Sequence, residues 1–231
     1  MKLKIGLALL ALAGFATFSN ADQTKTDVTE RLETSTKVLD QIVNAPDKGI
    51  PDEVLKGAKC IAVVPNLLKG GFVLAGKHGR GLASCRLPKG GWSAPAFFVI
   101  SGGSWGAQIG VESIDLVMLA MTDEGMRHLM SDKFQIGGSV SAAVGPLGRD
   151  ASAATDWKVN TQFLTYSRSK GLFAGIDLGG SVVQHDTDST LALYAKDLST
   201  RAILDGEVPA PAASREFLAE VRKVKTEAHA R

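Results

Sequence analysis

The chain has 231 residues, of which 45% are hydrophobic and 22% charged, proportions typical of a globular protein. They exclude collagen-like, low-complexity and broadly disordered chains. The formal net charge of +2 argues against a general nucleic-acid binder. Two cysteines are too few for a disulfide-dense scaffold or, by themselves, a four-ligand zinc site. Aromatic residues are scarce and glycines abundant, which favours a sheet of aliphatic side chains with close backbone approaches.

The first 21 residues have the pattern of an export signal. Lys2 and Lys4 precede an apolar run at 5–18, and small residues stand at the −3 and −1 positions of a cleavage site after Ala21. The run is shorter than the roughly 20 apolar residues that a membrane anchor needs. We therefore expect a periplasmic or secreted protein that can lie peripherally on a membrane. Cleavage would leave 24 basic and 24 acidic residues.

Two helices are predicted at the start of the exported chain. Residues 27–30 read as a capping box, and apolar residues then recur at helical spacing to about Asn44. Residues 50–53 begin a second, short helix, with proline at its first position and acidic residues in its first turn.

After Gly57, short apolar runs alternate with glycine-, proline- and lysine-containing turns, as in an antiparallel meander that closes toward a barrel or sandwich. The predicted strands are residues 60–64, 72–76, 81–86, 96–100, 107–111, 114–121, 139–144, 160–168 and 172–183. Further helices are expected at 122–130, 189–196 and 214–228. The prediction is therefore α+β: a single domain whose antiparallel strands form a curled sheet or barrel-like sandwich, flanked by N-terminal and C-terminal helices.

One motif raises the possibility of an enzyme. Residues 102–106 (GGSWG) fit the nucleophile elbow of α/β-hydrolases, with Ser104 as nucleophile and Asp115, Asp123, His128 or His185 as later triad members. The elbow needs a strand before the serine and a helix after it, whereas a second strand follows here, so a glycine hairpin is the simpler interpretation. The four histidines lack metal-binding spacing. We expect no catalytic residues, no metal and no cofactor.

Charge is distributed unevenly along the chain. Residues 54–111 contain no Asp or Glu but seven Lys or Arg residues. Such a basic half can attract an anionic surface if the charges share one face. Alternatively, they are spread around the strand ends and form no patch, because strand register decides which face each side chain occupies.

The two cysteines are expected to form a disulfide. Export places Cys60 and Cys85 in an oxidising compartment, and two is the number that leaves no thiol unpaired. In a flat meander with the predicted strand at 72–76 between them, they would lie about 9.5 Å apart, too far to bond. Bonding therefore requires a curled sheet or strands that pair out of sequence order. The alternative is two buried free thiols.

An ordered series of glycine segments resembles one known family. The segments are residues 69–72 (KGGF), 79–81 (GRG), 91–95 (GWSAP), 106–110 (GAQIG), 145–149 (GPLGR) and 166–175 (YSRSKGLFAG). Together they resemble the SYLF domain, the lipid-binding domain of yeast and animal endocytic adaptors, which is also described as actin-binding in yeast. The resemblance implies a non-enzymatic module that binds anionic phospholipids through basic residues and an amphipathic N-terminal segment.

The resemblance covers about residues 35–205 and sets the expected organisation. A signal peptide occupies 1–21, a helical lead-in 22–34, the SYLF-like domain 35–205, and a linker with the C-terminal helix 206–231. The expected function is binding of anionic phospholipid or a membrane surface in the periplasm. The alternatives are an envelope structural or protein-interaction protein and, further off, a serine hydrolase. Export argues against actin as a partner, and no nucleic acid is expected. The candidate lipid-binding residues are Lys69, Lys77, Arg80, Arg86, Arg149 and Lys170.

Overall fold

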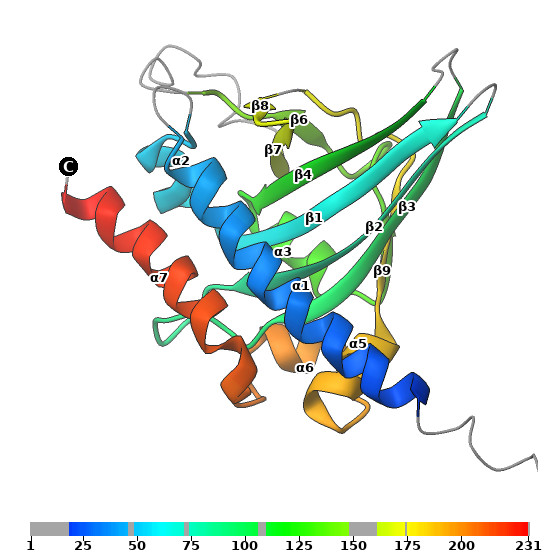
Figure 1. Ribbon diagram of the computed structural model, residues 1–231. Coiled ribbons are helices and arrows are strands. Elements are labelled where there is room, and N and C mark those ends of the chain that lie inside the picture. Colours follow the sequence, from blue (N-terminus) through cyan, green and yellow to red (C-terminus); the bar gives the residue numbers. More distant parts are fainter. Residues whose placement is uncertain are drawn as a thin grey trace, which may run out of the picture.

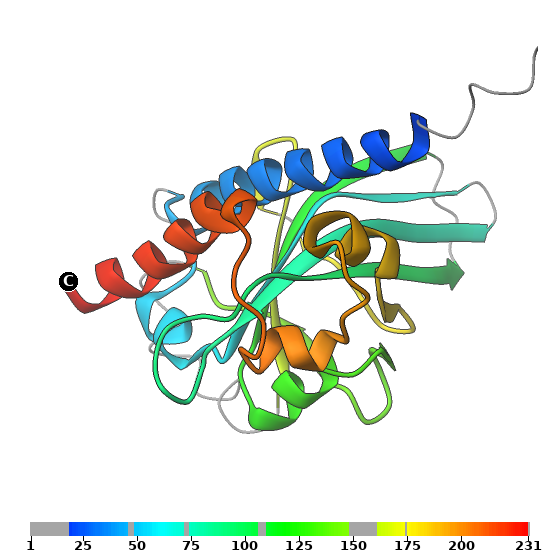
Figure 2. The ribbon, with the colours of Figure 1, turned by 90° about the horizontal axis from the view of Figure 1, so that it is seen from below.

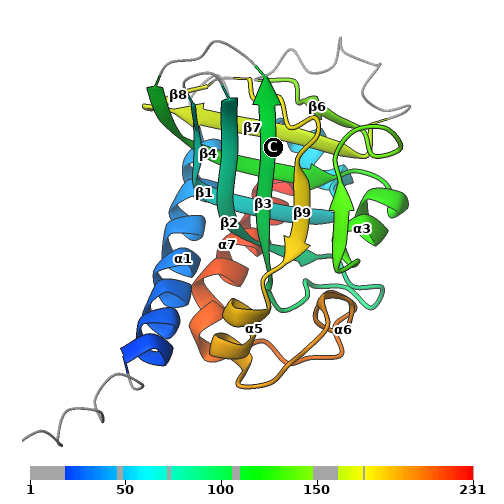
Figure 3. The same ribbon diagram turned by 90° about the vertical axis from the view of Figure 1, so that its right-hand side faces the viewer.

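The centre of the fold is a sheet that curls into a half-barrel (Figures 1 and 3). The structure is a computed structural model and describes residues 19–45, 49–71, 74–105, 110–147, 161–173 and 175–230. Its strand order is β5-β9-β3-β2-β1-β4-β7-β6, with β8 paired to β7. The strands are β1 (Cys60–Gly71), β2 (Leu74–Cys85), β3 (Ala96–Trp105), β4 (Gly110–Ala120), β5 (Lys133–Gln135), β6 (Ala142–Val144), β7 (Phe163–Ser169), β8 (Leu172–Phe173) and β9 (Val182–His185).

The helices lie on both sides of this sheet, and Figure 2 shows α1 and α7 together on one side and α3 and α6 on the other. The helical segments are α1 (Ser19–Val43), α2 (Asp52–Gly57), α3 (Asp123–Leu129), α5 (Thr187–Tyr194), α6 (Thr200–Leu204), the 3-10 turn η2 (Ala212–Ser214) and α7 (Arg215–Ala230). The α+β prediction, with a curled sheet and terminal helices, is confirmed.

The sheet separates two hydrophobic cores. Along β1, Ile61 and Val63 point to the convex side, where α1, α2 and α7 cover them. The alternate residues Cys60, Ala62 and Val64 point into the concave side. Both faces of β1 are therefore buried, which is why its sequence is a continuous apolar run rather than an alternating one.

Helix α1 begins at Ser19, so the predicted start at Asp27 is wrong: the expected capping box lies inside the helix. Val28, Leu32, Leu39 and Ile42 form its buried stripe against the convex core. The helix also runs through the position of the predicted cleavage after Ala21, and residues 1–18 lie outside the described part of the chain.

Several predicted turns are continuous strand. Residues 74–76 and 81–85, from two separate predicted strands, belong to one long strand, β2, and the turn expected at 77–79 is absent. Residues 72–73 lie outside the described part of the chain. The predicted Pro65–Asn66 turn is an irregularity inside β1, between Val64 and Leu67 in its pairing with β4. Within β2, glycines permit close packing instead of breaking the strand. A Cβ atom on Gly79 would lie 2.7 Å from Leu67 Cδ1.

The later part of the chain differs more from the prediction. The strand predicted at 172–183 is the short β8, a crossing segment (residues 175–181) and β9. β3, β2, β1 and β4 separate β9 from β7 in the sheet order, so this segment spans the half-barrel, and its Ile176 and Leu178 join the concave core. The sequence pattern missed β5 and α6, and β6 pairs with β7 in parallel rather than antiparallel.

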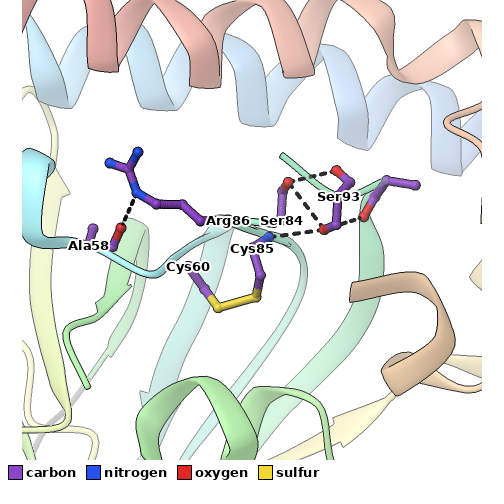
Figure 4. Close-up of a disulfide and its surroundings, with 7 residues drawn as sticks. Ala58, Cys60, Ser84, Cys85, Arg86 and Ser93 are labelled. Atoms are coloured by element: carbon purple, nitrogen blue, oxygen red, sulfur yellow. Dashed lines mark hydrogen bonds between the residues drawn. A yellow bond between two sulfur atoms is a disulfide. The ribbon is translucent and has the colours of Figure 1, made fainter. Parts of the chain in front are cut away.

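The predicted disulfide between Cys60 and Cys85 is present. The strand expected between the two cysteines is part of β2, so they lie directly opposite one another where β1 begins and β2 ends, with Cα atoms 4.0 Å apart. Figure 4 shows the bond beside Ser84 and Ser93, where the Ser93 hydroxyl accepts from the Cys85 amide at 3.0 Å. We call the end of the sheet where β1 begins and β2 ends the disulfide end. The opposite end, where β1 ends and β2 begins, is the hairpin end.

Replacing both cysteines by alanine should lower the free energy of unfolding by about 3 kcal/mol, because the bridge joins residues 25 positions apart and restricts the unfolded chain. Urea unfolding of the wild type and the double variant measures this difference. In the wild type, no thiol should react with maleimide under denaturing, non-reducing conditions. Two reactive thiols in the exported protein would contradict the bond.

Gly81→Ala should destabilise the sheet by about 1–3 kcal/mol, because the added Cβ would lie 2.6 Å from Val63 O and 2.8 Å from Phe98 Cζ. Gly76→Ala, in the same strand, is the matched control, since its Cβ would meet only Gly102 O at 4.0 Å. Urea midpoints compare the two variants. Equal losses would show that strand propensity, and not steric exclusion, accounts for the effect.

Candidate functional site

Lys77 is a buried residue of β2 that points into the half-barrel, with 4% of its surface exposed. Its ammonium donates to the backbone carbonyl of Asp177 at 2.7 Å and so holds the crossing segment in place. Burial lowers the pKa of Lys77, the Asp177 charge opposes this shift, and Lys69 adds to it. The structure therefore gives Lys77 an internal partner and does not present it on the surface with the other predicted lipid-binding residues.

Arg86 lies at the disulfide end and caps α2. Its Nε donates to Ala58 O at 2.6 Å and its Nη2 to Leu55 O at 3.0 Å, so it satisfies carbonyls at the C-terminus of that helix. The guanidinium also lies 4.7 Å from the centre of the Trp92 ring. Burial lowers the pKa of Arg86. These contacts give Arg86 a structural role far from the hairpin end.

Arg80 belongs to an ionic cluster under α1, on the convex side. Its side chain is 45% exposed, and its Nε lies 3.9 Å from Asp186 Oδ2. The same oxygen accepts from Arg31 Nη1 at 3.3 Å, and Arg31 also donates to Ser189 Oγ at 2.8 Å. Asp186 in turn caps α5 by accepting from the Ser189 amide. The pattern of charges gave no sign of this cluster, because Arg31 and Asp186 are 155 residues apart.

Burial also sets the electrostatics of this cluster. Arg31 is 9% exposed, and burial lowers the pKa of its guanidinium while the Asp186 carboxylate opposes that shift. The Arg31 guanidinium lies 5.7 Å from the centre of the Phe97 ring. The cluster therefore connects α1, α5 and the sheet, and Arg80 is partly neutralised by it.

Lys69 and Lys170 lie at the hairpin end. Lys69 is near the end of β1, opposite Lys77 of β2 and Glu112 of β4. Lys170 is exposed in the turn between β7 and β8 and has a positive φ of 49°. β7 runs antiparallel to β4 with Arg168 opposite Asp115, so this turn points to the end where β4 begins. Arg149, the sixth predicted residue, lies outside the described residues.

Three large apolar side chains are exposed at the same end. Leu68 is 49% exposed, Val111 79% and Leu172 73%. Leu68 is opposite Ser113, and Val111 is two residues before Ser113 in β4, so Leu68 and Val111 point to the same, convex side. Leu172 follows the turn that contains Lys170. The sequence analysis missed these residues. A detectable signal for Leu68 and Leu172, though not for Val111, was a nearby lysine, at 68–69 and 170–172.

The other polar features of the structure do not extend the group of cationic and apolar residues at the hairpin end. A pocket of about 410 Å³ near α5 is lined by Asp132, His185, Asp197 and neighbouring residues, and its carboxylates would repel an anionic ligand. Among the described residues, no group of three or more His, Cys, Asp and Glu side chains could hold a metal ion. No helix in the described ranges is both long and apolar enough to cross a membrane.

Ser104 does not occupy a nucleophile elbow. It is a strand residue of β3, opposite Ala75 of β2, and the next described element after β3 is another strand, β4. A nucleophile elbow instead places its serine in a sharp turn from strand to helix. Of the possible acidic partners, Asp115 pairs with Arg168 at 3.5 Å and Asp123 with Lys59 at 2.7 Å. The geometry therefore does not support a nucleophile elbow. Residues 102–105 of the GGSWG motif lie within β3 rather than in the expected glycine hairpin, and Gly106 is outside the described residues.

Asp186→Ala should lower the free energy of unfolding by about 3–5 kcal/mol, because it leaves the Arg31 guanidinium buried without its counter-charge. Arg80→Ala, which removes the exposed partner of the same carboxylate, should cost less than about 1 kcal/mol. Urea unfolding at neutral pH compares them. Should Asp186→Ala fail to fold, Asp186→Asn removes only the charge, and a loss no greater than that of Arg80→Ala would overturn this assignment.

Comparison with known proteins places the chain in a family. Residues 101–224 match the family model Ysc84, described as "Las17-binding protein actin regulator". The chain is 37% identical over 175 residues to the SH3 domain-containing YSC84-like protein 1 of Rattus norvegicus, covering 75% of this chain and 51% of that protein.

Two fungal proteins give similar matches. Protein YSC84 of Saccharomyces cerevisiae is 36% identical over 175 residues, covering 74% of this chain and 37% of the yeast protein. The SH3 domain-containing protein PJ696.02 of Schizosaccharomyces pombe is 39% identical over 168 residues, covering 71% and 39% of the two chains. The chain thus spans about half or less of the length of these relatives. It belongs to the Ysc84 family, whose shared domain is the SYLF domain.

Proposed function

We propose that this protein is a non-enzymatic module that binds anionic phospholipid surfaces in the bacterial periplasm. The observation that carries the proposal is the position of Lys69 and Lys170 at the hairpin end, the end of the sheet that also carries exposed apolar side chains. The buried disulfide and the signal-like first 21 residues support an oxidising compartment outside the cytosol. The position of Ser104 within a strand supports a binding role rather than hydrolysis.

The electrostatic attraction of this surface is modest. A lysine near an anionic membrane contributes about 1 kcal/mol, so Lys69 and Lys170 together supply roughly 2 kcal/mol. The exposed carboxylate of Glu112, opposite Lys69, reduces that sum. Binding should therefore be reversible and sensitive to salt, because exposed charges are screened over about 8 Å at physiological ionic strength.

A protein partner is the second candidate function. The description of the matching family model, a Las17-binding actin regulator, favours it. The two functions differ in their dependence on lipid: a protein-interaction module without lipid affinity would not sediment with vesicles of any headgroup composition.

Reversing both charges, in Lys69→Glu/Lys170→Glu, should weaken binding to vesicles containing phosphatidylglycerol at least about tenfold, because two attractive charges become repulsive. Co-sedimentation at low and high salt measures this. The control, Lys89→Glu/Lys196→Glu, makes the same charge change at exposed positions away from the hairpin end and should bind better than the hairpin-end variant. Equal losses in both variants would show that net charge, rather than this surface, governs binding. No sedimentation of the wild type with anionic vesicles would refute lipid binding.

A further inference from the structure

We propose that the hairpin end inserts Leu68, Val111 and Leu172 into the bilayer interface while Lys69 and Lys170 remain at the level of the lipid phosphates. This inference rests on the proposed function and names the element that enters the membrane. The three apolar side chains come from β1, β4 and β8, and only the register of the sheet brings them to one end.

The hairpin end projects beyond the helices that cover the rest of the convex face. In Figure 1, the ends of β1, β2, β3 and β4 extend past α1 toward the upper right. Leu68 and Val111 point to this uncovered side, whereas Ile61 and Val63, on the same side farther down the sheet, are completely buried. The uncovered side chains can therefore reach a bilayer without any rearrangement of the convex core.

Close packing of β1 against β4 determines the position of Val111. Gly70 is opposite Val111, and a Cβ atom at Gly70 would lie 3.1 Å from Val111 Cγ2 and 2.9 Å from Gly110 O. The glycine thus lets β1 and β4 continue side by side to the last residues of the hairpin end. Val111 is left 79% exposed on a regular strand, so little conformational freedom remains to be lost on insertion.

The lysines at the hairpin end favour an anionic lipid surface as the ligand of its apolar residues. Lys69 follows Leu68 in β1 but points to the concave side with Lys77 and Glu112, so it flanks the same end of the sheet from the opposite face. Lys170 is two residues before Leu172. Long lysine side chains can keep their ammonium groups at the phosphates while neighbouring apolar groups lie deeper. Combined apolar burial and attraction to anionic lipid is the mode by which peripheral proteins bind an interface. The surface matches an anionic bilayer in both properties.

Helix α1 is not the inserting element in this arrangement. Its apolar residues Val28, Leu32, Leu39 and Ile42 are at most 1% exposed and pack against the convex core. Arg31 additionally ties the helix to Asp186 and Ser189. Insertion of α1 would require the convex core to open, whereas Leu68, Val111 and Leu172 are already exposed at the hairpin end.

The test places an environment-sensitive label at single introduced cysteines. Val111→Cys and Leu172→Cys carry the fluorophore NBD at the hairpin end, and Leu191→Cys, a 51% exposed apolar position on α5, is the control. The native cysteines are buried and bonded to each other, so they do not compete for label without reductant. With phosphatidylglycerol vesicles, NBD at 111 and 172 should brighten and shift to the blue, and NBD at 191 should not.

Binding of unlabelled variants completes the test. Val111→Ser/Leu172→Ser should bind the same vesicles at least about tenfold more weakly than wild type, whereas Leu191→Ser should bind as wild type does. The outcomes separate the two proposals. If the wild type does not bind, the proposed function fails. If it binds but the label at 111 and 172 stays in water, or the serine variant binds normally, the insertion surface is overturned and lipid binding stands.

Discussion

The direct pairing of β1 with β2 on one side and β4 on the other is the constraint on which the rest of the structure depends. Cys60 faces Cys85 across one pair and Ala120 across the other, so three strands are aligned at the disulfide end. Because both faces of β1 are buried, a shift of one residue would exchange the convex and concave cores. The same register carries Leu68, Lys69 and Val111 to the hairpin end.

Basic residues in this protein are used in two different ways. Lys77 and Arg31 are buried, and each has acceptors that offset part of the cost of removing a charge from water: a backbone carbonyl for Lys77, and Asp186 with Ser189 for Arg31. Lys69 and Lys170 remain at the surface, where an anionic ligand can reach them. Within the acid-free stretch, residues 54–111, Lys77 is bonded internally and Lys69 lies at the surface, and only a residue of the second kind can attract a membrane.

The chain corresponds to one part of its longer relatives. The chain covers 51% of the mammalian relatives and 37–39% of the fungal ones, so the shared part is the folded domain described here. In this domain the convex side is largely covered by α1 and α7, while the hairpin end is open (Figures 1 and 2). The open end is the part of the surface where apolar and cationic side chains meet.

The sequence by itself determined the family, the α+β class and the disulfide partners, because the glycine segments, the short apolar runs and the cysteine count are local or compositional signals. It placed several turns wrongly, since a glycine such as Gly79 is read as a strand break when it serves close packing against Leu67.

Only the tertiary structure decided the roles of the five predicted basic residues that it describes. It buried Lys77, directed Arg86 to the end of α2, paired Arg80 with Asp186 and left Lys69 and Lys170 at the hairpin end. Arg149 alone of the six is outside the described chain. The physical reason is that pairing between strands distant in sequence, not local composition, decides which face and which end of a sheet a side chain occupies.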